Sequence, residues 1–301
     1  MKDKYLIVIV GPTGAGKTSV SIALAKHFAS EVISSDSRQI YKNLTIGTAA
    51  ITPEEQEGIP HHFVGTLDIE ENFNAFEYEQ QALALMDNRF QDHDTLVMCG
   101  GSMMYIDAVC KGIDVMPDVD LAIREQLKQR VEDEGVAALS AQLKEVDKTY
   151  YHSIDIKNPA RVIHGLEVYL TTGKPISSFR NNAPKERPFK IIKIGITLPR
   201  EDLYDRINKR VDKMLSDGLL DEARHFYPYR ECNSLKTVGY RELFEYFDGK
   251  IALDEAVRLI KRNSRHYAKK QLTWFRKDAS IQWFLPSEIE KILHYSDKVI
   301  N

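Results

Sequence analysis

The sequence GPTGAGKT occupies residues 11–18, directly after the apolar run Tyr5 to Val10 and directly before the helix-like segment Ser19 to His27. It matches the phosphate-loop template G-x-x-x-x-G-K-[ST] in the order that the template requires: a buried strand, a glycine-rich turn and the start of a helix. We therefore predict a diphosphate-binding loop made of Gly11, Pro12, Thr13, Gly14, Ala15, Gly16, Lys17 and Thr18.

The chemistry of this loop follows from its residue types. Glycines allow the backbone to curl until several N–H groups point at one diphosphate, and the following helix adds the positive end of its dipole. We expect Lys17 to reach the outer phosphate and the Thr18 hydroxyl to complete the coordination of a magnesium ion. Mg²⁺ is thus the predicted cofactor. The loop predicts a diphosphate and leaves open whether a nucleotide carries it.

Composition limits the class of protein. The 301 residues are 43% hydrophobic, enough for one large or two modest domains. The net charge of −3 gives no global sign of nucleic acid binding, so any such surface must be local. The three cysteines show no metal spacing, and no apolar stretch has the length of a membrane span or a signal peptide. We therefore expect a cytoplasmic protein with no membrane segment. We also expect a monomer.

The hydrophobic pattern predicts an α/β fold. Short β-rich runs alternate with helical segments from Met1 to about Met116, namely Tyr5 to Val10, Glu31 to Ser35 and Thr95 to Cys99. This alternation is typical of a parallel sheet flanked by helices, as in P-loop NTPases. The polar loops that follow such strands gather at the carboxyl edge of the sheet, where ligands bind.

The middle of the chain reads as an insertion. Residues 118–185 are helical and highly charged, with apolar residues at helical spacing in Leu121 to Glu134 and Val136 to Val146, and a further helix from Ala160 to Thr171. Lys190 to Leu198 returns to the sheet, and from Thr237 onward we predict helix almost to the end. The predicted domains are a P-loop-like catalytic core of residues 1–117 and 186–301, which includes a helical C-terminal region, and an all-helical insertion of residues 118–185.

Two strand ends carry candidate chemistry. The second strand leads to Asp36, whose carboxylate would face the phosphate loop and could take a proton or bind magnesium through water. The alternative is that Asp36 caps a helix that begins at Ser37. The third strand ends in Cys99, Gly100, Gly101 and Ser102, where an ATPase motor or switch would carry a magnesium-binding Asp. Because this strand end has no such Asp, a motor ATPase or a switch GTPase is disfavoured.

Basic residues gather in two helical segments. Arg206, Arg210 and Lys213 share one helix face, where a solvated surface is the ordinary explanation and a contact with an outer phosphate is the alternative. The run from Arg258 to Lys277 contains no acidic residue and includes Arg265, Lys269 and Lys270. Like charges repel along such a run, which favours a nucleic acid backbone as its partner.

Taken together, these segments resemble those of bacterial tRNA dimethylallyltransferases, the IPP transferase family. The resemblance rests on GPTGAGKT, SSDSRQIYKNLTIGTA, GGSMMYIDAV, NPARVIHGLEVYLTTGKPIS and VGYRELFEYFDGK through RHYAKKQLTWFRKD, which together span nearly the whole chain in order. It implies transfer of a dimethylallyl group from dimethylallyl diphosphate to the exocyclic N6 of adenosine 37, just 3′ of the anticodon of tRNA. No zinc-finger segment of the eukaryotic relatives follows Asn301, so we expect a bacterial-type enzyme.

The resemblance also implies roles for residues. Asp36 is the implied general base, with Lys17 and Thr18 holding donor phosphate and magnesium, and with Arg206 and Arg210 near the diphosphate. The implied tRNA contacts are Asp36, Ser37, Arg38, Gln39, Ser102, Arg124, Arg161, Val162, Ile163, His164 and Gly165. This chain departs from the family pattern where Ser102 replaces a threonine, and where His164 and Gly165 replace an arginine and an alanine.

Three alternatives stay open on sequence grounds. A P-loop small-molecule or nucleoside kinase would also pair the loop with Asp36, but it leaves the basic C-terminal run unexplained. A non-catalytic RNA-binding ATPase or switch lacks the acidic strand end that it needs. A prenyltransferase that acts on free adenylate keeps the chemistry but again gives the basic run no partner.

Overall fold

A computed structural model describes residues 3–180 and 183–300. The chain divides into two compact units. The first combines Met1–Lys111 with Glu186–Asn301, and the second is Gly112–Lys185. Each unit has its own buried apolar core.

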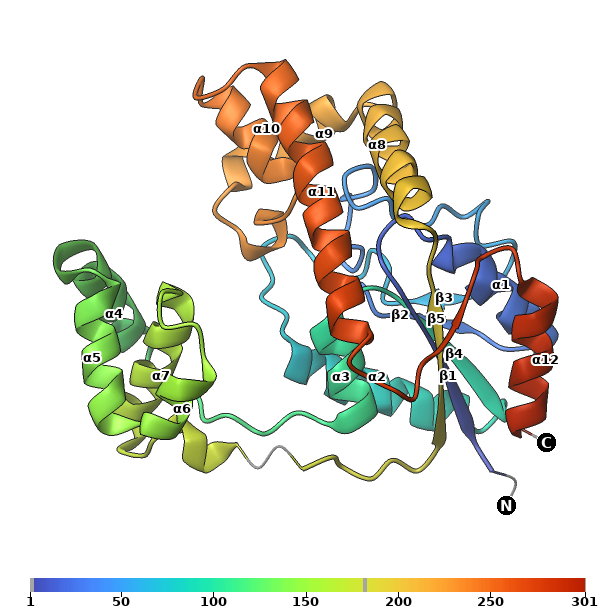
Figure 1. Cartoon of the computed structure of the whole chain (residues 1–301), viewed down its shortest axis with the longest axis horizontal. Coiled ribbons are helices and arrows are strands. Elements are labelled where there is room, and N and C mark those ends of the chain that lie inside the picture. Colours follow the sequence, from blue (N-terminus) through green and yellow to red (C-terminus); the bar gives the residue numbers. More distant parts are fainter. Residues whose placement is uncertain (1–2, 181–182, 301) are drawn as a thin grey trace. The chain divides into compact units, whose positions relative to one another are not determined.

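The first unit is built on a parallel sheet (Figure 1). In the described residues this sheet has six strands in the order β3-β2-β4-β1-β5-β6, with every neighbouring pair parallel. The strands are β1 (Tyr5–Val10), β2 (Val32–Ser34), β3 (His61–His62), β4 (Thr95–Cys99), β5 (Lys190–Ile196) and β6 (Gln282–Phe284). The central strand β1 is buried along its whole length, which explains its continuous apolar sequence.

Alternate side chains of β1 serve two separate cores. Leu6, Val8 and Val10 pack with residues of α2 (Ala75–Arg89) and α3 (Met103–Lys111). Ile7 and Ile9 point the other way, toward α1 (Lys17–His27) and α12 (Ile289–Ile300). This period of two is the geometry of a strand covered on both faces, and each fully buried aliphatic side chain contributes about 1.5–3 kcal/mol.

A group of helices lies beyond the sheet in the first unit. It contains α8 (Arg200–Ser216), α9 (Leu219–Phe226), α10 (Tyr240–Phe247) and the long α11 (Leu253–Phe275), with short 3₁₀ turns at Tyr227–Tyr229 and Asn233–Leu235. Apolar residues of these helices share a core with Ile40, Tyr41 and Leu44 of the loop after β2. Figure 1 shows α11 running from this group of helices back toward α3.

The second unit is a small helical bundle. Its helices are α4 (Leu121–Glu134), α5 (Val136–Val146), α6 (Lys148–Ser153) and α7 (Pro159–Thr172), followed by a 3₁₀ turn at Ile176–Phe179. Asn158 caps the start of α7 through its side chain, Pro159 takes the first helical position, and Gly173 ends the helix in the left-handed conformation. These are the residue types that favour those positions.

The α/β fold with a parallel sheet is confirmed. One prediction about the C-terminal region is wrong, because β6 interrupts the helices and adds an edge strand beside β5. Its three residues, Gln282–Phe284, are too few to show a periodic pattern. In the described ranges, no helix is both long enough and apolar enough to cross a membrane.

Candidate active site

A cavity of about 610 Å³ opens at the carboxyl edge of the sheet in the first unit. The phosphate loop, the ends of β2 and β4, α8 and α11 all contribute to its walls. Such crevices at the carboxyl ends of parallel strands are where α/β folds bind ligands. Residues of the predicted site that line it are Thr13, Gly14, Gly16, Lys17, Thr18, Asp36, Ser37, Arg38, Gln39 and Arg210.

The phosphate loop has the geometry that its glycines predict. Gly11 has a φ of +148°, and a Cβ there would lie 2.2 Å from the Ile196 carbonyl oxygen, so only glycine fits against the end of β5. Gly16 has a φ of +89° and is the N-cap of α1, which receives no side-chain cap and has no acidic residue in its first turn. The first N–H groups of α1 are therefore suited to an anion.

Lys17 and Arg210 are among the basic residues that line the cavity. The Lys17 ammonium donates to the Pro12 carbonyl oxygen at 2.9 Å. Desolvation lowers the pKa of Lys17, and this outweighs the opposite effect of Asp36. Desolvation likewise lowers the pKa of Arg210, whose guanidinium donates weakly to Thr13 Oγ1 at 3.3 Å. Both shifts mean that positive charge is held here away from water, an arrangement that favours a bound anion.

Asp36 follows β2 and lines the same cavity. Its Oδ1 accepts from the backbone N–H of Arg38 at 2.8 Å and of Gln39 at 3.2 Å. Residues 37–40 form a turn, so the predicted alternative of a helix beginning at Ser37 is wrong. In the described part of the chain, hydrogen bonds reach only Oδ1 of this carboxylate, which leaves Oδ2 able to accept a proton.

Ser37, Arg38 and Gln39 are held by neighbouring loops. Ser37 N–H donates to Ser102 Oγ at 2.8 Å, and the Ser102 hydroxyl in turn donates to Ser37 Oγ at 3.1 Å. Ser102 is buried and does not line the cavity. Arg38 donates to the Asn233 carbonyl oxygen, and Gln39 donates to the carbonyl oxygens of residues 48 and 49. The Ser102 hydroxyl thus orients the turn after Asp36, and its contact with tRNA stays a prediction.

Two residues that sequence reasoning missed fix the walls of the cavity. The Glu222 carboxylate on α9 accepts from the backbone N–H groups of Thr45, Ile46 and Gly47, which hold the loop before residues 48 and 49. Gln271 on α11 accepts from Thr13 N–H and donates to the Gly101 carbonyl oxygen. Gln271 lies in the segment RHYAKKQLTWFRKD that carries the family resemblance, but the local sequence of Gln271 or Glu222 does not show which distant loop its side chain contacts.

Arg206 takes a different position from Arg210. It lies one helical turn earlier on α8 and is exposed, and it does not line the cavity. A Cβ added to Gly16 would lie 3.7 Å from Arg206 Nη1, so this guanidinium is close to the start of α1. Both arginines are therefore near the phosphate loop, and only Arg210 faces the cavity.

Magnesium fits the donor set of this site. The described residues contain no group of three or more His, Cys, Asp or Glu side chains that could hold a metal. Mg²⁺ does not need such a cage, because it keeps several waters and binds through one or two protein oxygens and the phosphates of the substrate. Thr18 and Asp36 both line the cavity and supply oxygens of that kind.

The IPP transferase family model matches residues 39–278. The chain belongs to the IPP transferase family. The family predicted from the sequence is thus confirmed, and the kinase alternative is not supported.

Two relatives are similar in sequence to this IPP transferase along nearly its whole length. It is 53% identical to tRNA dimethylallyltransferase 1 of Phocaeicola vulgatus over 294 residues, and 52% identical to tRNA dimethylallyltransferase 1 of Bacteroides fragilis over 295 residues, spanning 98% of each chain in both cases.

Solved structures give the same result. A tRNA isopentenylpyrophosphate transferase of Bacillus halodurans is 38% identical with a TM-score of 0.74, covering 99% of this chain and 97% of that one. A eukaryotic dimethylallyltransferase, described as acting on tRNA, is 25% identical with a TM-score of 0.78, covering 96% of this chain and 75% of that one.

The two halves of the basic run from Arg258 to Lys277 differ in the contacts that their side chains make. In its first half, Arg258 pairs with Glu255, Lys261 with Asp212, and Arg265 donates to Asn208 Oδ1 at 2.6 Å. In its second half, a shallow groove on α11 is lined by His266, Lys269, Lys270, Thr273, Trp274 and Lys277. Arg258 and Lys261 are thus paired with carboxylates, whereas the described residues offer Lys269, Lys270 and Lys277 no ion pair.

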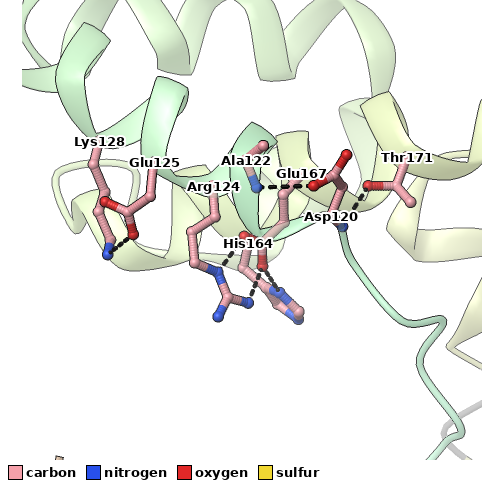
Figure 2. A network of polar contacts seen from close by, with 8 residues as sticks. All are labelled: Asp120, Ala122, Arg124, Glu125, Lys128, His164, Glu167 and Thr171. Carbon is pink, nitrogen blue, oxygen red and sulfur yellow. Dashed lines mark hydrogen bonds and ion pairs between the residues drawn. The ribbon is translucent and has the colours of Figure 1, made fainter. Parts of the chain in front are cut away.

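In the second unit, the predicted tRNA contacts Arg124 and His164 share one buried carboxylate (Figure 2). Arg124 donates to Glu167 through Nε at 2.7 Å and Nη2 at 2.8 Å, and His164 Nδ1 lies 2.8 Å from Glu167 Oε1. Burial opposes ionisation of Glu167, but these hydrogen bonds outweigh it and lower its pKa to about 2. The network fixes both side chains on one side of the α4–α7 pair.

The segment from Arg161 to Gly165 divides between core and surface. Val162, Ile163 and Gly165 are buried in the core of the second unit, whereas Arg161 is exposed and His164 is partly exposed. Of these predicted tRNA contacts, only Arg161 and His164 have side chains that a ligand could reach. Gly165 has a packing role, since a Cβ there would lie 2.7 Å from the ring of Tyr150.

Proposed function

We propose that this transferase moves a dimethylallyl group from dimethylallyl diphosphate to the exocyclic N6 of adenosine 37 in tRNA and releases diphosphate. One observation carries the proposal: a carboxylate, Asp36, lines the same cavity as the two desolvated cations Lys17 and Arg210. A cavity of this kind holds a diphosphate and offers a proton acceptor to a second substrate.

The two ends of the donor match different walls. Its diphosphate would bind the N–H groups at the start of α1, with Lys17 and Arg210 as counter-charges. Its apolar dimethylallyl end has Ile207, Val211 and Met214 of α8 and Ile260 of α11 as neighbours, all of which line the cavity. Apolar walls beside a charged end orient an amphipathic donor.

In the proposed reaction, the adenine N6 attacks the first carbon of the dimethylallyl group. A carbon–nitrogen bond forms, the carbon–oxygen bond to diphosphate breaks, and the electron pair leaves with the diphosphate. Asp36 Oδ2 takes the proton that N6 loses. Lys17 and Arg210 stabilise the negative charge that grows on the leaving group, and such preorganised charge is usually the largest part of catalysis.

Magnesium would add to this charge stabilisation. Bound by Thr18 and the donor phosphates, it would act as a Lewis acid on the leaving group. The hydroxyl of Thr18 lies at the start of α1, beside the groups that would hold the diphosphate.

The tRNA would approach from outside the sheet. A base must leave its stack to reach a site inside a protein, and a base in a single-stranded loop does so at lower cost. Tyr267 of α11 lines the cavity and offers an aromatic face for such a base. We assign the phosphate contacts to Lys269 and Lys270 of the α11 groove, and to Arg124, Arg161 and His164 of the second unit. Arg265, already bonded to Asn208, would make a secondary contact.

We place this activity in the cytoplasm, where tRNA is modified, and in a monomer.

The test is a paired incubation of the protein with labelled dimethylallyl diphosphate, Mg²⁺ and either unmodified tRNA or free AMP, with ATP hydrolysis followed in parallel. Label entering tRNA at adenosine 37, without ATP turnover, is the expected result. Label entering AMP instead would support the free-adenylate alternative and overturn the tRNA assignment. ATP turnover without label transfer would overturn the prenyl transfer itself.

A further inference from the structure

Gln271 of α11 connects two loops that face the cavity. Its side chain is 2% exposed. Its Oε1 accepts from Thr13 N–H at 2.9 Å, and its Nε2 donates to the Gly101 carbonyl oxygen at 2.9 Å. One carboxamide thus joins the phosphate loop to the turn after β4.

The space around this carboxamide is matched to glutamine. Gly101 has no side chain, and a Cβ there would lie 2.3 Å from Gln271 Nε2. An asparagine at position 271 is one methylene shorter and could not span both partners from the same helix. Leucine fills similar volume but leaves the partly buried Thr13 N–H and the buried Gly101 carbonyl without their Gln271 partner, which is costly.

The two backbone partners also fix the orientation of the amide. Thr13 N–H can only donate and the Gly101 carbonyl can only accept, so Oε1 must face Thr13 and Nε2 must face Gly101. An ionised glutamate would present a second oxygen to the Gly101 carbonyl and would repel it. A protonated glutamate, by contrast, has one carbonyl oxygen and one O–H, and it reproduces the pattern of the amide.

The hydrogen bond between Gln271 and Thr13 affects the donor site in two ways. Thr13 is the third residue of the phosphate loop, and holding its N–H toward α11 fixes the curvature that presents the later N–H groups at the start of α1. The Thr13 hydroxyl is the partner of Arg210 Nη1 at 3.3 Å. Gln271 therefore acts, through Thr13 alone, both on the loop amides and on the desolvated cation Arg210.

We propose that Gln271 is a positioning residue for the diphosphate. It holds the phosphate loop in its anion-binding shape, keeps Arg210 directed at the cavity through Thr13, and removes the Thr13 N–H from the set of groups that bind phosphate. This inference rests on the proposed function for the identity of the donor, but the binding of diphosphate to the loop can be measured without any transfer reaction.

The experiment measures the affinity of full-length protein for inorganic pyrophosphate with Mg²⁺ by calorimetry, alongside its affinity for tRNA. The variants are Gln271→Leu and Gln271→Glu. Ser30→Ala is the matched control, because it removes a buried 2.7 Å hydrogen bond to the Thr95 carbonyl oxygen at the opposite edge of the same sheet. We expect Gln271→Leu to weaken pyrophosphate binding by about tenfold, as the loss of two net hydrogen bonds implies, and to leave tRNA affinity unchanged. We expect Ser30→Ala to bind pyrophosphate and tRNA as the wild type does.

The glutamate variant supplies a signature that a merely structural role would lack. At about pH 8 its ionised carboxylate should weaken pyrophosphate binding at least as much as leucine does, and burial should raise its pKa. The ratio of its dissociation constant to that of the wild type should then fall toward one as the pH is lowered to about 5.5, while the ratio for Gln271→Leu stays constant. Comparison with the wild type at each pH removes the titration of pyrophosphate itself.

Two outcomes would overturn the proposal. One is pyrophosphate affinity in Gln271→Leu equal to that of the wild type. The other is a defect in Gln271→Glu that does not respond to pH or that Ser30→Ala shares, because general destabilisation would then explain the loss. If the wild type binds pyrophosphate but transfers no label to tRNA, the proposed function fails and the role of Gln271 in diphosphate binding still stands.

Discussion

Replacing Glu167 by glutamine tests the contribution of this buried carboxylate, which binds Arg124 and His164 in Figure 2. The carboxylate has a pKa of about 2 in place of its ordinary 4.5, which corresponds to about 3 kcal/mol of stabilisation when it is ionised. Arg124 and His164 are 38% and 36% exposed, so solvent screening reduces this figure. We expect Glu167→Gln to cost about 2 kcal/mol in local stability of α4 and α7.

The sign of the pH dependence follows from the lowered pKa. A carboxyl group with a lower pKa in the folded state stabilises the fold above its unfolded pKa, and the stabilisation is lost as the pH falls from about 4.5 toward about 2. At neutral pH the contribution is fully present. The Glu167→Gln variant has no such carboxylate, so the difference between wild type and variant should disappear in strong acid.

Hydrogen exchange of the full-length protein, followed by mass spectrometry, measures this locally. At neutral pH, peptides from α4 and α7 should lose about 30-fold in protection in Glu167→Gln, the equivalent of about 2 kcal/mol. Peptides from α2 in the first unit are an internal reference. Glu125→Gln is the control, because Glu125 pairs with Lys128 on the surface of the same network, where its side chain is 69% exposed. Unchanged protection in α4 and α7, or an equal loss in Glu125→Gln, would refute the reasoning.

Three further predictions concern catalysis, tRNA binding and packing. Asp36→Asn should lower the single-turnover rate of transfer by about 10²-fold or more while sparing tRNA affinity, and equal loss of both would count against its role as a base. Charge reversal at Lys269 and Lys270 should weaken tRNA binding and reduce the slope of log affinity against log salt by about 2, and an unchanged slope would remove the α11 groove from the interface. Gly165→Ala should destabilise the second unit by about 1–3 kcal/mol, because the new methyl overlaps the Tyr150 ring, and unfolding at wild-type denaturant concentration would contradict this packing.

The phosphate loop and the strands around it could be predicted because their signals are local. Residues 5–10 form β1 and residues 95–99 form β4, each with the predicted bounds. The helices from 121 to 134 and from 136 to 146 also agree with their predicted bounds. In each case a run of apolar residues at one period ends at a glycine or a polar residue, so a short window contains the whole signal.

The contacts that shape the cavity could not be predicted, because they join distant parts of the chain. Gln271 lies 258 residues from Thr13, and Glu222 lies 177 residues from Thr45. A glutamine or glutamate in a helical segment is ordinarily a surface residue, and its local sequence does not reveal a partner so far away in the chain. In the basic run from Arg258 to Lys277, the charge and the i,i+3 spacing of Arg258 and Glu255 are local signals. The pairing of Lys261 with Asp212, by contrast, depends on the packing of α8 against α11.

The desolvated pair of Lys17 and Arg210 has a consequence for turnover. Groups that stabilise a departing diphosphate in the transition state remain in place once it has departed, and the free diphosphate carries more charge than the ester from which it came. The product should therefore leave slowly, and repeated cycles would proceed at the pace of its exit. Slow release of diphosphate from this cavity predicts a burst in which each protein rapidly forms one modified tRNA. A slower steady phase should follow, and added pyrophosphate should suppress it.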